Sequence, residues 1–481
     1  MVRKLFHLLL ITLFLASCAP GTHQFIPSPD GSFTASPIAT NQVEIRPQYN
    51  PGDLVDYIAQ TGDTLPALAV HFNTTVDKIR QTNPNIPGDA TTMPPGMPMK
   101  IPIYYLPYWG SQFQIIPDNL FVNGPSSVNF NTETFVASHP GWLKDYHGFV
   151  SGQNRDGAKT IDLVALNFSI SPQLLLALLE YQAQALSKQE APGSSYVLGY
   201  KDFAHEGLYM QLVWAANILN NGYYGWRSGH IRSFEHPDGR LERPDPWQNA
   251  ASVAIQSYFV SKQTDEYDLA IGPQGIAKTF TELFGDPWKE MDPHIPASLK
   301  QPEFLFPFAK GQSWTFTGGP HSGWGTLEPY SGIDFAPPAN IGGCNPTDLW
   351  ATAVASGVIA RSETGIVVLD LDGDMDERTG WDIFYLHTAT EGRISKGVQV
   401  KAGDPIGYPS CEGGRATGTH IHIARKYRGE WIPADGTLAI NLEGWIAHDG
   451  ERPYLGTLTR GNQIVTACEC SNMASRVTAG K

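Results

Sequence analysis

The pattern of apolar residues changes near Phe306, and this change constrains the fold most strongly. From residue 110 to about residue 295 the chain reads mainly as helices joined by aromatic loops. Beyond Phe306, short β-branched or aromatic runs alternate with Gly, Pro and Asp turns, as in antiparallel strands. A chain of 481 residues is too long to fold around one ordinary hydrophobic core, so we expect a multidomain α+β protein. The clearest predicted strands are 354–361, 366–371, 381–387 and 420–426, within a C-terminal β-rich domain of residues 303–450 that is followed by an extension, 451–481.

Four histidines and one aspartate in this β-rich domain have the composition of a metal site. His420 and His422 are two residues apart on a predicted strand, so their side chains point to the same face. Zinc binds imidazole nitrogen and carboxylate oxygen, and a catalytic zinc site keeps one position open for water. Two histidines and an aspartate satisfy that count and leave two histidines for acid–base chemistry. The candidates are His321, Asp334, His387, His420 and His422.

The motifs around these residues resemble the lysostaphin and LytM class of cell-wall metallopeptidases, and within it the β-lytic branch. They are the segments 319–322, 329–334, 385–387 and 411–422. The resemblance implies an antiparallel fold of the duplicated-hybrid-motif type and a zinc metalloendopeptidase that cuts peptide cross-links of peptidoglycan. It also implies that His321, Asp334 and His422 bind one Zn²⁺ ion, while His387 and His420 flank the reacting groups.

One position departs from the commonest members of that class. Their first ligand is a histidine four residues before the aspartate, where this chain has Tyr330. The β-lytic branch takes its histidine thirteen residues before the aspartate, which is the spacing of His321 to Asp334. The alternative is an inactive relative that binds peptidoglycan and activates other wall hydrolases.

The segment 53–103 has the order strand, helix, helix, strand. A Gly-Asp-Thr-Leu turn precedes the first helix, and an Asn-Pro-Asn loop follows the second. The segment resembles a LysM module, in which these two loops flank a shallow groove for N-acetylglucosamine chains. The alternative is a structural spacer without a ligand. The resemblance implies that the glycan contacts are Gly62, Asp63, Thr64, Asn83 and Ile86.

The segment 110–298 is predicted to contain a helix that begins at Ser171 and Pro172, a good N-cap and first-turn pair. This helix distantly resembles the one that presents the catalytic glutamate in lysozyme-like transglycosylases. Gln182 occupies the matching position, and a glutamine cannot protonate a glycosidic oxygen. Glycan cleavage with Glu180 as the acid is therefore the lesser alternative to a packed helical spacer.

A second helix is predicted over about 207–219, ended by Asn-Asn-Gly at 220–222, and a third near Asn249. The aromatic residues that follow are expected to be exposed, where they could hold glycan. These residues are Tyr223, Tyr224 and Trp226.

The first 18 residues resemble a bacterial lipoprotein signal. A short basic start precedes an apolar run that is shorter than the roughly 20 residues needed to cross a bilayer. Leu-Ala-Ser-Cys then resembles a lipobox, which implies lipidation of Cys18 and anchoring to a bacterial membrane on its extracytoplasmic side. Ordinary secretion is the alternative. Residues 19–52 are rich in Pro, Thr, Ser and Asn, which predicts a flexible tether.

Charge and cysteines narrow the partners and the compartment. The net charge of −14 argues against nucleic acid as a partner. If Cys18 carries lipid, four cysteines remain in a compartment that permits disulfides. Cys468 and Cys470 are too close in sequence for a relaxed bridge, so Cys344 with Cys411 is the preferred pair, and a thiolate zinc site is the rival interpretation.

Overall fold

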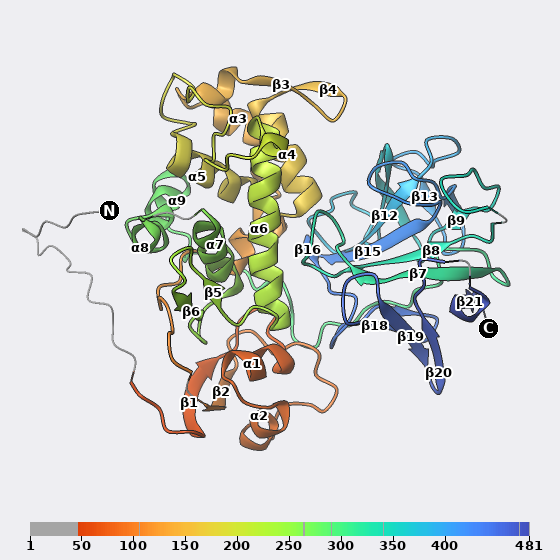
Figure 1. The fold of residues 1–481 in the computed structure, drawn as a ribbon, viewed down its shortest axis with the longest axis horizontal. Helices are drawn as coiled ribbons and strands as arrows, with labels where there is room; N and C mark the ends of the chain where they lie inside the picture. The colour runs from red at the N-terminus through yellow and green to blue at the C-terminus, as the bar shows by residue number, and fades with distance from the viewer. Residues whose placement is uncertain are drawn as a thin grey trace, which may run out of the picture. The chain divides into compact units, whose positions relative to one another are not determined.

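The computed structural model describes residues 47–104, 106–262, 265–289, 291–339, 341–470 and 472–480 (Figure 1). The proposed signal, Cys18 and most of the expected tether lie outside these residues. Within them, no helix combines the length and the apolar character needed to cross a membrane.

Residues 53–103 form the βααβ unit that the sequence predicts, here called the LysM-like module. Its two strands, β1 (Asp53–Ile58) and β2 (Pro98–Ile103), pair antiparallel. Helices α1 (Leu65–His71) and α2 (Val76–Thr82) pack on them, and each begins at a threonine whose hydroxyl accepts a backbone N–H. Leu68, Phe72, Ile79 and Ile101 are fully buried, so this small unit has its own core.

Residues 110–298 contain seven α-helices within the described chain, and we call this part the helical domain. Short 3-10 turns and the two-stranded pairs β3–β4 (His147–Val150, Gln153–Asp156) and β5–β6 (Phe234–Glu235, Leu241–Glu242) join them. The helices are α3 (Thr132–Ala137), α4 (Gly157–Phe168), α5 (Pro172–Ala183), α6 (Leu208–Ser228), α7 (Ala250–Ser261), α8 (Tyr267–Ile271) and α9 (Ile276–Phe284).

The predicted end of the second helix at Leu219 is wrong, because α6 continues to Ser228. Asn220 is buried, and its amide donates to the Phe168 carbonyl oxygen over 2.9 Å. A Cβ atom on Gly222 would lie 2.6 Å from the Cα atom of Ala254, so glycine here lets α7 approach closely. The Asn-Asn-Gly sequence therefore forms a helix–helix contact and does not end the helix.

The expectation of exposed aromatic residues after Leu219 is wrong for the same reason. Tyr223, Tyr224 and Trp226 are only 0%, 1% and 5% exposed. The continued helix turns them into the protein, where Tyr223 stacks on Phe121 at a centroid distance of 4.2 Å. They are core residues and cannot form a glycan-binding surface.

The C-terminal part, here called the β domain, is built on a nine-stranded antiparallel sheet among the described residues. Its order is β13-β10-β11-β12-β15-β8-β7-β21, with β16 also paired to β15. Residues after 450 belong to it, because β19 and β20 complete a four-stranded sheet with β17 and β18, while β21 pairs with β7. The small pair β9–β14 completes the domain. The main-sheet strands are β7 (Ser313–His321), β8 (Gly332–Ala336), β10 (Gly357–Glu363), β11 (Gly365–Asp370), β12 (Trp381–Thr388), β13 (Gln399–Val400), β15 (Ile421–Tyr427), β16 (Glu430–Trp431) and β21 (Arg476–Thr478), and the others are β9 (Ala351–Thr352), β14 (Pro405–Gly407), β17 (Asn441–Leu442), β18 (Trp445–Asp449), β19 (Gly456–Arg460) and β20 (Gln463–Thr466).

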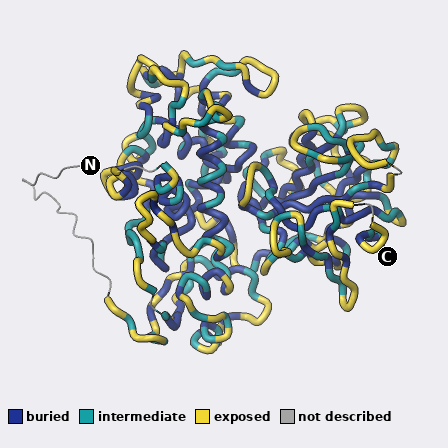
Figure 2. Tube along the Cα trace, viewed as in Figure 1, coloured by how far each residue is buried: buried dark blue, intermediate teal, exposed yellow. Residues whose placement is uncertain are grey.

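The two faces of the main sheet belong to different cores. Phe335, Tyr385 and Ile421 lie in the β domain's own core, whereas Phe384 and Ala424 share a core with the helical domain. The strands are accordingly buried along most of their length, as Figure 2 shows in dark blue. The helical domain therefore packs on the same sheet face to which the side chain of His422 belongs by strand alternation.

Helix α1 of the LysM-like module contacts the C-terminal end of α6. His71 stacks on Trp226 with ring centroids 3.5 Å apart, and its Nε2 donates to the Trp226 carbonyl oxygen over 3.0 Å. Burial is the main cause that lowers the pKa of His71 to about 3.

Lowering the pH from 6.5 toward 3 is expected to weaken this contact. Only the unfolded or undocked histidine binds a proton in that range, so His71 lowers the free energy of unfolding by up to about 4 kcal/mol as the pH falls. Burial raises the pKa of Asp63 to about 6, so proton binding by Asp63 raises the free energy of unfolding as the pH falls. A substitution of His71 alone separates the two effects. We expect His71→Gln to flatten the decrease in melting temperature between pH 6.5 and 4. An equally steep decrease in the variant would contradict this expectation.

Candidate metal centre

Three adjacent strands bring His321, Asp334 and His422 together. Strand β8 lies between β15 and β7, with Asp334 opposite both His422 and Gly318. Irregular pairing of β7 after Phe316 moves His321 to the position opposite Gly332. The three side chains are buried, and their ligand atoms lie close together.

The three candidate ligand atoms lie at the corners of a nearly equilateral triangle. The Nδ1 atom of His422 is 3.0 Å from His321 Nε2 and 3.0 Å from Asp334 Oδ1. The third edge, from His321 Nε2 to Asp334 Oδ1, is 3.3 Å. Ligand atoms around a tetrahedral zinc ion lie about 3.3 Å apart, so the three atoms fit three corners of such a site.

Local hydrogen bonds and glycines fix the orientation of these side chains. The Nδ1 atom of His321 donates to the Gly319 carbonyl oxygen over 2.8 Å, which leaves its Nε2 free for a metal ion. A Cβ atom on Gly332 would lie 2.1 Å from Cε1 of His422, so only glycine leaves room for that ring. The position of the His422 imidazole thus depends on a residue without a side chain.

The charges are those of a cation site. Burial alone would raise the pKa of Asp334, but the charges of His321 and His420, together with hydrogen bonds, hold that pKa well below its usual range. Burial tends to lower the pKa of His321, yet the Asp334 carboxylate raises it above its usual value. An ionised carboxylate among buried imidazoles can hold a divalent cation.

His387 and His420 lie beside this triangle. Their rings are 4.4 Å apart between centroids, and His420 Nε2 is 3.7 Å from Asp334 Oδ2. Each donates from Nδ1 to a carbonyl oxygen, His387 to Glu412 over 2.9 Å and His420 to Gly418 over 2.7 Å. In the neutral form of either ring, Nε2 is then the nitrogen that can accept a proton.

His387 has a backbone conformation that few residues other than glycine adopt. Its φ is +65°, and it is the extra residue where β12 passes from Leu386, opposite Ile366, to Thr388, opposite Gly365. Such a bulge redirects a side chain. Burial first, and then the nearby histidines, lower the pKa of His387 to about 4, so this imidazole is neutral at neutral pH.

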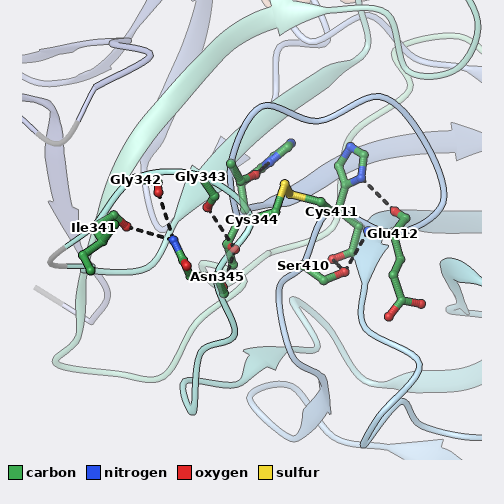
Figure 3. Close-up of a disulfide and its surroundings, with 12 residues drawn as sticks. Ile341, Gly342, Gly343, Cys344, Asn345, Ser410, Cys411 and Glu412 are labelled. Carbon is green, nitrogen blue, oxygen red and sulfur yellow. Dashed lines mark hydrogen bonds between the residues drawn. A yellow bond between two sulfur atoms is a disulfide. The ribbon is translucent and has the colours of Figure 1, made fainter.

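A disulfide supports the two loops that orient these histidines. Cys344 and Cys411 are joined, with Cα atoms 5.7 Å apart, as Figure 3 shows. Glu412 follows this bridge and accepts the His387 hydrogen bond, while Thr419, next to His420, donates from its backbone N–H to Gly343 over 3.1 Å. The bridge thus connects the supports of both histidines.

Cys468 and Cys470 are also joined, contrary to the sequence-based expectation. Their Cα atoms are 5.0 Å apart, within the range of ordinary disulfides, because the chain turns at Glu469. The rival interpretation of a thiolate zinc site has no support among the described residues, since all four of these cysteines are paired.

Removing the first bridge, in Cys344→Ser with Cys411→Ser, is expected to lower any catalytic rate that depends on His387 and His420 by about 10- to 100-fold, because a residue that orients another typically contributes that much. Metal content should match that of the unmodified protein, since His321, Asp334 and His422 lie on paired strands. Removal of the second bridge, in Cys468→Ser with Cys470→Ser, is the matched control. Loss of zinc in the first variant, measured by elemental analysis, would contradict this assignment.

Tyr454 is a residue near the site that the sequence analysis missed. Its ring stacks on His321 at a centroid distance of 4.0 Å, and its backbone oxygen accepts from Gly319 over 2.8 Å. It lies in the segment that was expected to be only a C-terminal extension, 120 positions beyond Asp334. No motif marks it, because only the pairing of β18 and β19 brings it there.

Comparisons with known proteins agree with this architecture. Residues 57–102 match the LysM domain family, and residues 114–298 match the family described as LasA, N-terminal domain. Protease LasA of Pseudomonas aeruginosa is 27% identical over 338 residues, which cover 66% of this chain and 75% of LasA. The chain is thus similar to LasA over about two thirds of its length and also matches the LysM domain family. The β-lytic metalloendopeptidase of Achromobacter lyticus is 29% identical over 140 residues, covering 27% of this chain and 35% of that protein.

Two solved structures are similar to parts of this chain. The M23 metalloprotease pseudoalterin is 22% identical, with a TM-score of 0.30, over 35% of this chain and 96% of pseudoalterin. The catalytic domain of lysostaphin from Staphylococcus simulans is 23% identical, with a TM-score of 0.18, over 26% of this chain and 89% of that domain. The sequence similarity to LasA and to the β-lytic metalloendopeptidase, together with the LysM match, supports a LytM-type peptidase that carries a LysM module.

Proposed function

We propose that the chain is a zinc-dependent endopeptidase that hydrolyses peptide cross-links of peptidoglycan. The observation that carries this proposal is the triangle of His321 Nε2, Asp334 Oδ1 and His422 Nδ1, with edges of 3.0 to 3.3 Å. These three residues would hold one zinc ion. When bound, zinc acts as a Lewis acid toward a peptide carbonyl and lowers the pKa of water.

The two remaining histidines supply proton transfer. Neutral His387 can accept a proton at Nε2, because its Nδ1–H is held by Glu412. His420, whose Nδ1–H is held by Gly418, is positioned beside Asp334 and can donate from Nε2 when protonated. Proton transfer to the leaving amine completes hydrolysis without a covalent intermediate.

The other parts of the chain would hold the enzyme at its substrate. The LysM-like module binds N-acetylglucosamine chains through Gly62, Asp63, Thr64, Asn83 and Ile86. Lipidated Cys18 anchors the chain to a membrane on its extracytoplasmic side. Tethering raises the local concentration of wall peptides, so the peptidase site needs only modest affinity.

The helical domain has a supporting role in this proposal. The only carboxylate that the transglycosylase alternative offers, that of Glu180, accepts hydrogen bonds from the Leu186 N–H over 2.7 Å and the Ser187 hydroxyl over 2.5 Å. It therefore stabilises the turn after α5 and is not positioned as a free acid.

The test is mass spectrometry of purified peptidoglycan after digestion, with and without 1,10-phenanthroline. We expect new free amines without new reducing sugar ends, and no digestion when the chelator is present. New reducing ends would indicate a glycosidase, and an undigested wall would favour an inactive regulator.

A further inference from the structure

The segment 294–299, which joins the helical domain to the β domain, lies against the LysM-like module. Thr61, in the turn before α1, donates from its hydroxyl to the Ile295 carbonyl oxygen over 3.3 Å and accepts from the Ile295 N–H over 3.0 Å. Thr92, in the loop after α2, donates to the Pro296 carbonyl oxygen over 2.7 Å and accepts from the Leu299 N–H over 3.2 Å. The segment is thus hydrogen-bonded to both loops.

Two further bonds complete this contact. The Ser298 N–H donates to the Thr92 carbonyl oxygen over 3.0 Å, and the Thr91 hydroxyl donates to the Leu299 carbonyl oxygen over 2.7 Å. These bonds all use backbone amides of the segment. An N-acetylglucosamine chain presents the same chemistry, because each N-acetyl group carries one amide N–H and one carbonyl oxygen.

These two loops are the ones that flank the proposed glycan groove. The first contains Gly62, Asp63 and Thr64, and the second starts at Asn83 and includes Ile86. They touch each other, since the Met93 N–H donates to the Asp63 carbonyl oxygen over 2.8 Å. We propose that residues 294–299 fill the glycan groove as an internal ligand, so that this segment and N-acetylglucosamine chains compete for the LysM-like module.

The opposite side of the segment contacts the β domain. Ile295 and Leu299 are buried in a small cluster with Trp381 of β12 and Ile432. His294 lies 2.5 Å from the Glu430 carboxylate of β16, through its Nε2 atom. Glycan that displaces the segment would therefore loosen contacts to β12, which also carries His387. By linkage, whatever loosens those contacts also favours glycan binding.

The inference rests on the proposed glycan-binding role of the module and adds that the groove is covered in the free protein. Covering the groove lowers the apparent affinity for glycan, because only the fraction of molecules with an open groove can bind it. Leu299→Asp places a charge in the apolar cluster and is expected to release the segment. The matched control is Ala297→Ser, at an exposed position of the same segment.

The experiment measures binding of an N-acetylglucosamine pentamer to the full chain by calorimetry. We expect Leu299→Asp to bind at least about tenfold more tightly than the wild type, and Ala297→Ser to match the wild type. Equal affinity of all three proteins would overturn the competition while keeping the module as a glycan binder. If none of the three proteins binds the pentamer, although the segment is verified to be released in Leu299→Asp, the glycan-binding role itself is overturned.

Amide hydrogen exchange of the wild type tests the same proposal without a variant. The amides of Ile295, Ser298 and Leu299 are hydrogen-bonded to the module, so we expect them to exchange slowly and to lose protection when the pentamer is added. Unchanged protection at saturating pentamer would overturn the proposal, because the glycan would then be bound elsewhere.

Discussion

Replacement of His422 by alanine is expected to remove bound zinc and to lower the rate of peptide hydrolysis by at least about 10³-fold, since a Lewis acid contributes several kcal/mol to such a reaction. The substitution deletes one corner of the ligand triangle, whose other two corners, His321 Nε2 and Asp334 Oδ1, are 3.3 Å apart. Two protein ligands bind zinc much more weakly than three. Elemental analysis after dialysis and the digestion assay measure the two effects.

His448→Ala is the control for this experiment. His448 lies in the same domain but bonds to Thr459 over 2.8 Å, on β19, and takes no part in the ligand triangle. It should retain both zinc and activity. A His422→Ala protein with full zinc and full activity would show that the metal, if required, binds elsewhere.

His321→Ala distinguishes the β-lytic ligand set from the commoner one. The structure brings His321 to Asp334, whereas Tyr330, at the usual ligand position, has its ring 6.3 Å from that of His230 in the helical domain. We expect His321→Ala to lose zinc and Tyr330→Phe to keep it. The opposite result would make the commoner pattern the relevant one.

The sequence was most informative where a local pattern carries the information. Alternation on one strand placed His422 on a defined face, and the four predicted strands correspond to β10, β11, β12 and β15 within a few residues. The βααβ order of the LysM-like module was readable for the same reason, since strand and helix periods alternate over short stretches. The ligand roles of the histidines remain predictions.

The sequence was least informative where distant segments meet. Asn220 and Gly222 resemble a helix end, but tertiary contacts with Phe168 and Ala254 make them part of α6. Tyr454 reaches His321 only through sheet pairing. Residues 294–299 bond to the hydroxyls of Thr61 and Thr92 through their own backbone amides, which no sequence motif marks. Such contacts depend on the assembled fold, so no local rule predicts them.

The two parts of the histidine cluster are also expected to respond differently to substitution, which would separate metal binding from proton transfer. His387→Ala is expected to lower kcat by about 10²- to 10⁴-fold, the usual contribution of a general acid or base. Zinc content should stay at the wild-type level, because within the described residues no hydrogen bond joins His387 to the three proposed ligands, and its Nδ1 atom is held by Glu412. KM should change little, since the loss falls on the transition state.

The matched substitution for this prediction is Glu412→Ala, which removes a side chain from the residue that holds His387. The Glu412 backbone oxygen accepts the hydrogen bond from His387, so this variant keeps that bond and loses the side-chain contacts to Thr390 and Arg393. We expect a much smaller decrease in kcat than in His387→Ala. If His387→Ala loses zinc together with activity, His387 is a metal ligand, and the division of the cluster into three ligands and two proton carriers is wrong.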